Sequence, residues 1–279
     1  MENLKDYKIK ELKVTANNIR KSIVEMLCEA GSGHTGGALG MADIFALLYF
    51  QILKHKPENP FWENRDRLVL SNGHINPVLY ATMAEAGYFP KEELKTLRKF
   101  GSRLQGHPHR EFMSWLETSS GPLGEGLSQA IGMAITDKIY SGIKTIYALL
   151  SDGEHDEGNT WEAIMLASKE KLSNLIVIVD RNNIQIGGNT ERIMPLGDLR
   201  EKYESFGWNA CEVDGHDFAQ INGAIYKAQN HRGSPSVIIA RTIPGKGVKE
   251  WENDYRWHGK APNKKEAEMA LEELNNINY

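Results

Sequence analysis

The stretch from residue 145 to residue 188, TIYALLSDGEHDEGNTWEAIMLASKEKLSNLIVIVDRNNIQIGG, decides the fold of this chain. Two apolar runs, Thr145–Leu150 and Leu175–Asp180, have the length of buried strands, and Asn159–Lys169 between them has helical character. A strand, a helix and a second strand in this order predict a parallel pair joined by a right-handed crossover. The turns that follow the two strands should therefore lie at the same edge of the sheet.

The same alternation continues along the chain. Further helices and strands are expected at Leu196–Phe206, Asn209–Val213, Phe218–Asn230 and Ser236–Ala240, with an earlier short strand at Leu68–Leu70. Strands that alternate with helices of about ten residues are typical of a sheet covered on both faces. The predicted fold class is α/β, a parallel sheet flanked by helices on both faces, with Asp152, Asn182 and Gly215 at its carboxyl edge.

The rest of the chain is mostly helical. Apolar spacing predicts helices at Leu12–Ala30, Met41–Ile52, Pro77–Ala86, Lys91–Phe100 and Leu127–Tyr140. The loop at residues 31–37 is too rich in glycine to be helical. We expect a single domain over residues 1–279, with an N-terminal helical segment at 1–66 and a charged cap helix at 264–279.

Composition limits the possible partners and compartments. The chain has 279 residues, 41% of them apolar and 25% charged, and a formal net charge of −4. This charge, spread without long blocks, argues against nucleic acid or an anionic membrane as the main partner. The two cysteines belong to no metal or redox spacing, and no apolar run reaches the length of a membrane span. A cytoplasmic protein is expected.

The turns of the opening stretch carry oxygen ligands. Asp152 offers a carboxylate, Asn182 an amide oxygen, and the backbone carbonyl near Ile184 a third oxygen. Phosphate oxygens and water would complete about six oxygen ligands, which suits magnesium or calcium. A single carboxylate needs a ligand that brings its own negative charge, such as a diphosphate, and Gly153 lets a backbone N–H approach it closely. The alternative is that Asp-Gly and Asn-Asn are ordinary turn formers.

Histidines recur in glycine-containing turns elsewhere. His34, His74, His107 and His258 each stand beside a glycine or one residue away from one. A separate glycine-rich loop, TSSGPLGEG at residues 118–126, leads into a predicted helix, which suits an anion or a closely approached ring. This loop does not match a dinucleotide fingerprint, because Gln129 stands where the third glycine belongs.

Taken together, these motifs resemble one known family. The stretches GSGHTGGALG, DRLVLSNGH, TSSGPLGEGLSQAIGMA, TIPGKGV and WHGKAPN, with the SDG and NN turns, look like the N-terminal, diphosphate-binding domain of transketolase. The resemblance runs from Leu12 to Asn263. Ser151 departs from the pattern, because the family usually has glycine there. Serine is small, so we expect no loss of cofactor binding.

The resemblance implies a role for each matching residue. It implies that Mg²⁺ or Ca²⁺ is held by Asp152, Asn182 and the Ile184 carbonyl. It implies that thiamine diphosphate contacts Gly153, His74 and His258 through its diphosphate, Gly121 and Leu123 through its aminopyrimidine ring, and Ile186 and Ile243 as apolar neighbours. It also implies that the substrate channel is faced by His34, His107 and His258, whose imidazoles suit proton exchange near neutral pH. Glu157 matches a glutamate of a carboxylate network between paired sites.

The resemblance also implies a partner. Family members use a glutamate from a second, pyrimidine-binding domain to activate the cofactor, and this chain stops just after WHGKAPN. We therefore expect the N-terminal subunit of a split transketolase. A separate C-terminal subunit would carry the pyrimidine-binding and C-terminal domains, in an α2β2 assembly that acts on sugar phosphates.

Two alternatives remain at this point. The chain could serve a related thiamine diphosphate reaction, of the deoxyxylulose phosphate synthase type or with an unusual sugar phosphate. It could also be a non-catalytic, cofactor-binding regulatory protein. The presence of His34 and His107, which would face the substrate, argues against the regulatory protein.

Overall fold

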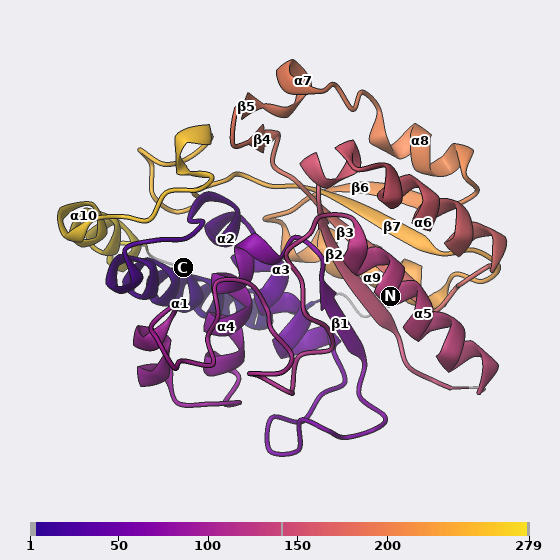
Figure 1. Ribbon diagram of the computed structural model, residues 1–279, viewed down its shortest axis with the longest axis horizontal. Coiled ribbons are helices and arrows are strands. Elements are labelled where there is room, and N and C mark those ends of the chain that lie inside the picture. The colour runs from indigo at the N-terminus through magenta and orange to yellow at the C-terminus, as the bar shows by residue number, and fades with distance from the viewer. Residues whose placement is uncertain (1–3, 141, 278–279) are drawn as a thin grey trace.

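A five-stranded parallel sheet forms the centre of the molecule (Figure 1). The computed structural model describes residues 4–140 and 142–277. Across the sheet the strands are β1 (Arg67–Leu70), β2 (Ile146–Ser151), β3 (Leu175–Arg181), β7 (Ser236–Arg241) and β6 (Asn209–Asp214). The predicted parallel α/β fold is confirmed. Because all five strands run the same way, the turns that begin at Asp152, Asn182 and Gly215 share one edge.

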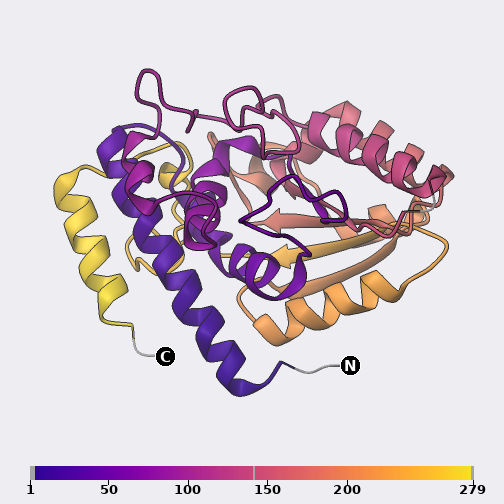
Figure 2. The ribbon, with the colours of Figure 1, turned by 90° about the horizontal axis from the view of Figure 1, so that it is seen from below.

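Side chains of the sheet alternate between two apolar cores. On β2, Tyr147 and Leu149 belong to one cluster of buried residues, and Ala148 and Leu150 belong to the other. The first core is covered by α1 (Asp6–Ala30), α3 (Ala42–Leu47), α4 (Asn76–Glu85) and α9 (Phe218–Asn230). The second is covered by α5 (Glu125–Ile139), α6 (Gly158–Lys169) and α8 (Leu199–Ser205). Figure 2 shows the sheet between α9 on one side and α5 on the other.

The C-terminal helix, α10 (Lys264–Asn275), lies beside α1 (Figure 2). The Asn263 side chain accepts a hydrogen bond from the Glu266 backbone and the Glu266 side chain accepts one from the Asn263 backbone, which forms a capping box at the start of α10. Near the other end, Nδ2 of Asn17 donates to the carbonyl of Leu274 at 2.8 Å. These contacts bring the last helix next to the first.

The glycine loop and the following helix differ from the prediction. A short helix, α2 (Gly36–Gly40), begins inside the glycine-rich loop, so the expectation of no helix there is wrong for Gly36 and Gly37. A Cβ on Gly37 would lie 2.8 Å from the side chain of Ile75, and one on Gly36 would lie 3.2 Å from the Trp257 carbonyl oxygen. Close packing therefore requires glycine inside this helix. After α3 the expected helix continues as a π-helical turn, Leu48–Ile52.

Other elements differ in length or were not predicted. The helix expected at Lys91–Phe100 is a 3₁₀ turn, Lys91–Thr96, which is followed by Arg98 in the left-handed region at φ 60°. After β3 the chain forms a small hairpin, β4 (Ile184–Gln185) and β5 (Gly188–Asn189), and then α7 (Thr190–Ile193). In Figure 1 this hairpin and α7 rise beyond the carboxyl edge of the sheet. Further 3₁₀ turns are Gly73–Ile75, Gly153–Asp156 and Tyr255–Trp257.

Candidate functional site

A cavity of about 500 Å³ lies at the carboxyl edge of the sheet. Most of the residues that the sequence singled out line it together, namely His34, His74, His107, His258, Gly121, Leu123, Gly153, Asn182, Ile184, Ile186 and Glu157. Ser151, Asp156, Gln185 and Gly187 complete the lining. A volume of this size suits an organic cofactor.

Asp152 does not itself line the cavity, although its chain neighbours Ser151 and Gly153 do, and it joins two turns. Its side chain is 1% exposed. Oδ1 accepts a hydrogen bond from the Gly153 N–H at 2.7 Å, and Oδ2 accepts one from the Asn183 N–H at 2.7 Å and one from Nη1 of Arg181 at 3.1 Å. Burial raises the pKa of the Asp152 carboxyl, and the Arg181 cation opposes this shift. Asp152 therefore contacts the turn after β3 directly, as the crossover geometry predicts.

Asn182 presents its amide in one orientation. Nδ2 donates to Oδ2 of Asp180 at 2.8 Å, and Oδ1 accepts from the Ile184 N–H at 3.0 Å. A flipped amide would place a donor against the Ile184 N–H, so these partners decide the assignment. Burial raises the pKa of Asp180 to about 7 although Thr242 also donates to it, and the charge of Asp152 adds to the rise. Asp180 was not predicted from the sequence, where its only signal is its place two residues before Asn182.

Three of the predicted histidines form a compact cluster. The ring centroids of His34 and His74 are 5.1 Å apart, those of His74 and His258 are 5.1 Å apart, and those of His34 and His258 are 5.6 Å apart. His107 lies beside Gly121, where a Cβ would be 3.8 Å from the imidazole. The four imidazoles thus come from four separate loops.

These imidazoles are held in the neutral form. Burial lowers the pKa of His34 to about 4, with further lowering from the charges of His258, Arg98 and His107. Burial is also the main cause that lowers the pKa of His74, His107 and His258. Nδ1 of His34 is buried and has no hydrogen-bond partner among the described residues. Neutral imidazoles can accept protons. An anion bound beside them would raise the pKa of each ring, because it favours the protonated form.

Arg98 is an exposed cation that does not line the cavity but lies near it, and it was not predicted from the sequence. Its charge acts on both His34 and His107, and its Nη2 donates to the Gly106 carbonyl at 3.3 Å. No carboxylate within residues 4–140 and 142–277 forms an ion pair with Arg98. A guanidinium that is not neutralised, placed beside these histidines, suits an anionic group on a ligand.

Ile243 does not line the cavity. Its backbone N–H donates to Nε2 of His216 at 2.8 Å, and Nδ1 of His216 lies 2.7 Å from Oδ2 of Asp43. Because Nε2 accepts, the proton of the neutral imidazole is on Nδ1 and points to the carboxylate. This chain of contacts attaches the loop after β7 to α3. Ile243 instead lines a separate hollow together with His216 and Lys246.

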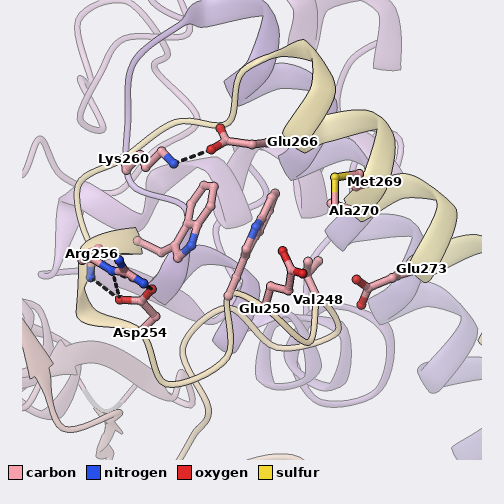
Figure 3. Close-up of a pocket in the computed structure, with 11 residues that line it drawn as sticks. Val248, Glu250, Asp254, Arg256, Lys260, Glu266, Met269, Ala270 and Glu273 are labelled. Carbon is pink, nitrogen blue, oxygen red and sulfur yellow. Dashed lines mark hydrogen bonds and ion pairs between the residues drawn. The ribbon is translucent and has the colours of Figure 1, made fainter.

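A second cavity, of about 350 Å³, lies between the 248–260 loop and α10 (Figure 3). Trp251 and Trp257 stack there with centroids 4.0 Å apart, and Nζ of Lys260 lies 4.0 Å from the Trp257 centroid. Figure 3 shows Lys260 paired with Glu266 and Arg256 paired with Asp254. Its cations are thus already engaged, and it contains none of the predicted site residues. The Trp257 stack instead supports the turn that presents His258 to the first cavity.

The part of the chain that the structure describes holds no group of three or more His, Cys, Asp and Glu side chains suited to a metal ion. The predicted metal site has one carboxylate and relies on the oxygens of its ligand, so it is not a cluster of that type. Within the same residues, no helix is long and apolar enough to cross a membrane.

Comparison with known proteins identifies the family. A family model described as the thiamine diphosphate binding domain of transketolase matches residues 12–275. The chain belongs to the transketolase family. It is 40% identical over 264 residues to 6-deoxy-6-sulfo-D-fructose transketolase subunit SqwG of Clostridium sp. (strain MSTE9), covering 95% of this chain and 96% of that subunit. It is 36% identical over 266 residues to one of the subunits of apulose-4-phosphate transketolase from Phocaeicola vulgatus, covering 95% of this chain and 94% of that protein.

Solved transketolases share the fold of this chain but are longer. The crystal structure of transketolase from Campylobacter jejuni superimposes with a TM-score of 0.90 at 36% identity, covering 96% of this chain and 44% of that one. The chain thus spans less than half of this transketolase but nearly all of the two subunits. The predicted family, N-terminal cofactor-binding unit and transketolase-type transferase class are thereby confirmed.

Proposed function

We propose that this chain is the N-terminal subunit of a thiamine diphosphate-dependent transketolase. Together with a separate C-terminal subunit it would transfer a two-carbon ketol unit from a ketose phosphate to an aldose phosphate. The observation that carries this proposal is that neutral histidines and the Gly121, Gly153 and Asn182 turns meet in one cavity. When bound, thiamine diphosphate supplies the nucleophile and the electron sink for breaking a carbon–carbon bond beside a carbonyl.

The donor set at the carboxyl edge fits a hard cation. We infer that Asp152, Asn182 and the Ile184 carbonyl hold Mg²⁺ or Ca²⁺. All three groups offer oxygen, and Oδ1 of Asn182, which accepts one hydrogen bond from the Ile184 N–H, has a second lone pair for a ligand. Arg181 supplies the only cation paired with Asp152 among the described residues. With one carboxylate already shared in this way, firm metal binding requires the charge of the diphosphate.

The residues of the cavity divide between cofactor and substrate. Gly153, His74 and His258 line the cavity and would contact the diphosphate, and the Gly153 N–H, which donates to Oδ1 of Asp152 in this structure, would have to be shared with it. Gly121 and Leu123 would contact the aminopyrimidine ring, and Ile186, which lines the cavity, would be an apolar neighbour of the cofactor. His34, His107 and His258 would hold and exchange the hydroxyl protons of the sugar, because their neutral rings can both donate and accept.

The substrate class follows from charge. Arg98 is exposed and does not line the cavity, but it packs near Gly33 and Gly106, which adjoin His34 and His107, and its charge suits an anionic substituent such as a phosphate. The two subunits compared above are named for a sulfonated hexose and for apulose 4-phosphate, and both compounds carry an anionic group. A transketolase for an unusual sugar therefore remains a specific second candidate.

A partner subunit would close the cavity. Ile186 lines it yet is 76% exposed, and Glu157 is exposed at the same rim. An apolar side chain this exposed beside a cofactor cavity suits burial against another polypeptide. We infer an α2β2 assembly in which Glu157 joins a carboxylate network between paired sites, as the resemblance implies.

The test is reconstitution. Ketol transfer is measured with this chain alone, and then with its co-purifying C-terminal partner while Mg²⁺ and thiamine diphosphate are titrated. We expect turnover only in the complex and only with both cofactors. Robust turnover by the chain alone would contradict the split enzyme, and cofactor saturation without turnover in the complex would favour a regulatory protein.

A further inference from the structure

We propose that Glu154 is a positioning residue that holds three cofactor-binding loops in register, an inference that rests on the proposed function. Glu154 is fully buried and does not line the cavity. Its Oε1 accepts hydrogen bonds from the Ser71 hydroxyl and from the Gly124 N–H, the latter at 2.6 Å. Its Oε2 accepts from the Ser151 N–H at 3.2 Å. One carboxylate thus connects three separate segments of the chain.

Each donor belongs to a loop that reaches the cavity. Ser71 begins the turn after β1 that carries His74, and Gly124 ends the loop that carries Gly121 and Leu123. Ser151 is the last residue of β2 and directly precedes Asp152, where the turn begins. Glu154 therefore joins the turn that carries His74, the loop that carries Gly121 and the turn that begins at Asp152. In the proposed function it touches neither cofactor nor substrate.

The surroundings of Glu154 show why a carboxylate stands there. Among residues 4–140 and 142–277, no cation forms an ion pair with it, and its burial raises the pKa of the carboxyl while the three donors oppose this. An apolar side chain would fill the space without burying charge. Unlike an apolar side chain, a carboxylate accepts hydrogen bonds from several donors at once, and it therefore orients the segments that carry those donors.

The packing around Glu154 leaves the loops little room to adjust. Gly124 has φ 82°, and a Cβ there would lie 1.9 Å from Oδ1 of Asn159. A Cβ on Gly126 would lie 2.5 Å from the Ser71 side chain. The glycine loop is thus pressed against the β1 turn, and the N–H of Gly124 has to point at the carboxylate. Loss of that acceptor would leave a buried donor unpaired and release the loop.

Glu154→Gln is the informative substitution because it preserves size. The glutamine oxygen can still accept from two donors, but its NH₂ group must then face the third donor. Asp66→Asn is a matched control. Asp66 is also buried and accepts from two backbone N–H groups, of Lys54 and Thr145, each at 2.9 Å. It lies at the amino ends of β1 and β2, on the edge of the sheet opposite the cavity.

The experiment uses the complex of this chain with its C-terminal partner, saturated with Mg²⁺. For E154Q we expect the KM for thiamine diphosphate to rise about tenfold, with kcat at saturating cofactor within about threefold of wild type. We expect D66N to lower Tm by about as much as E154Q does. The KM of D66N for thiamine diphosphate should stay within about twofold of the wild-type value. A cofactor KM in E154Q that matches wild type, or that rises equally in D66N, overturns the inference.

Two further outcomes complete the test. If E154Q does not fold, Ser71→Ala removes a single donor hydroxyl, and a rise in cofactor KM of about threefold is expected. An unchanged cofactor KM in S71A then overturns the inference. Failure of the wild-type complex to bind thiamine diphosphate overturns the proposed function and this inference together, whereas wild-type binding with an unaffected E154Q overturns this inference alone.

Discussion

Oδ2 of Asp152 accepts a hydrogen bond from the backbone N–H of Asn183 at 2.7 Å. This contact connects the turn after β2 with the turn after β3, and Asn183 makes it from the left-handed region at φ 62°. Asparagine tolerates that backbone conformation better than most residues. The carboxylate therefore holds the Asn182 turn in place.

Replacement of Asp152 by asparagine should abolish metal-dependent cofactor binding. The new NH₂ group would face the donors of Arg181 or Asn183, and the site would lose its only proposed anionic ligand. We expect the Kd for thiamine diphosphate with Mg²⁺ to rise by about 100-fold or more in the assembled complex. Calorimetric titration measures it, with Asp198→Asn, a change in an exposed helix cap, as the control. Wild-type affinity in Asp152→Asn would refute the assigned role.

His34 should make the protein sensitive to acid. Its folded pKa of about 4 lies below the unfolded value of 6.5, so between these values the unfolded chain binds more protons. The free energy of unfolding should therefore fall as the pH drops from 6.5 toward 4. From pH 7 to pH 5, wild type should lose roughly 1 to 2 kcal/mol more than His34→Asn. Urea denaturation at both pH values checks this, and equal losses in the two proteins would contradict it.

Arg98 should select anionic substrates. Replacement by asparagine removes the cation and still tolerates the left-handed backbone at this position. We expect the KM for a phosphorylated acceptor to rise about tenfold, with the KM for an unphosphorylated aldose and the Kd for thiamine diphosphate little changed. Arg232→Asn is the control, because that exposed arginine follows α9, ahead of the amino end of β7. An equal change for charged and neutral acceptors would disprove charge selection.

Ser151 replaces a glycine that is usual in the family. Its backbone groups make the important contacts, with N–H donating to Glu154 and the carbonyl lying 3.0 Å from Nδ1 of His155. The Kd of Ser151→Gly for thiamine diphosphate should therefore stay within about threefold of the wild-type Kd. It should lower the free energy of unfolding by roughly 0.5 to 1 kcal/mol, because glycine weakens the end of a strand. Titration and thermal unfolding measure the two effects, and a large gain in affinity would show that the serine side chain obstructs the cofactor.

Much of this organisation could be predicted because it depends on local pattern. The apolar runs of β2 and β3 and the helix between them appear as strand, helix and strand in the sequence, and right-handed crossovers then place Asp152 and Asn182 at one edge. The four histidines were recognisable from the glycine turns that carry them. Helix ends were less accurate, as at Lys91–Thr96, because the left-handed residue that follows is determined by its neighbours in space.

The residues that orient the site could not be predicted in this way. Glu154 and Asp180 contact no ligand in the proposed function, and their partners Ser71, Gly124 and Thr242 are distant in sequence. Arg98 comes near the cavity only because its loop folds against Gly33 and Gly106. The layered fold and the groups available for chemistry follow from periodicity and residue type, so both could be predicted from the sequence. Which of those groups face one cavity, and which buried carboxylates join their loops, depends on hydrogen bonding and burial between chain segments that meet only after folding.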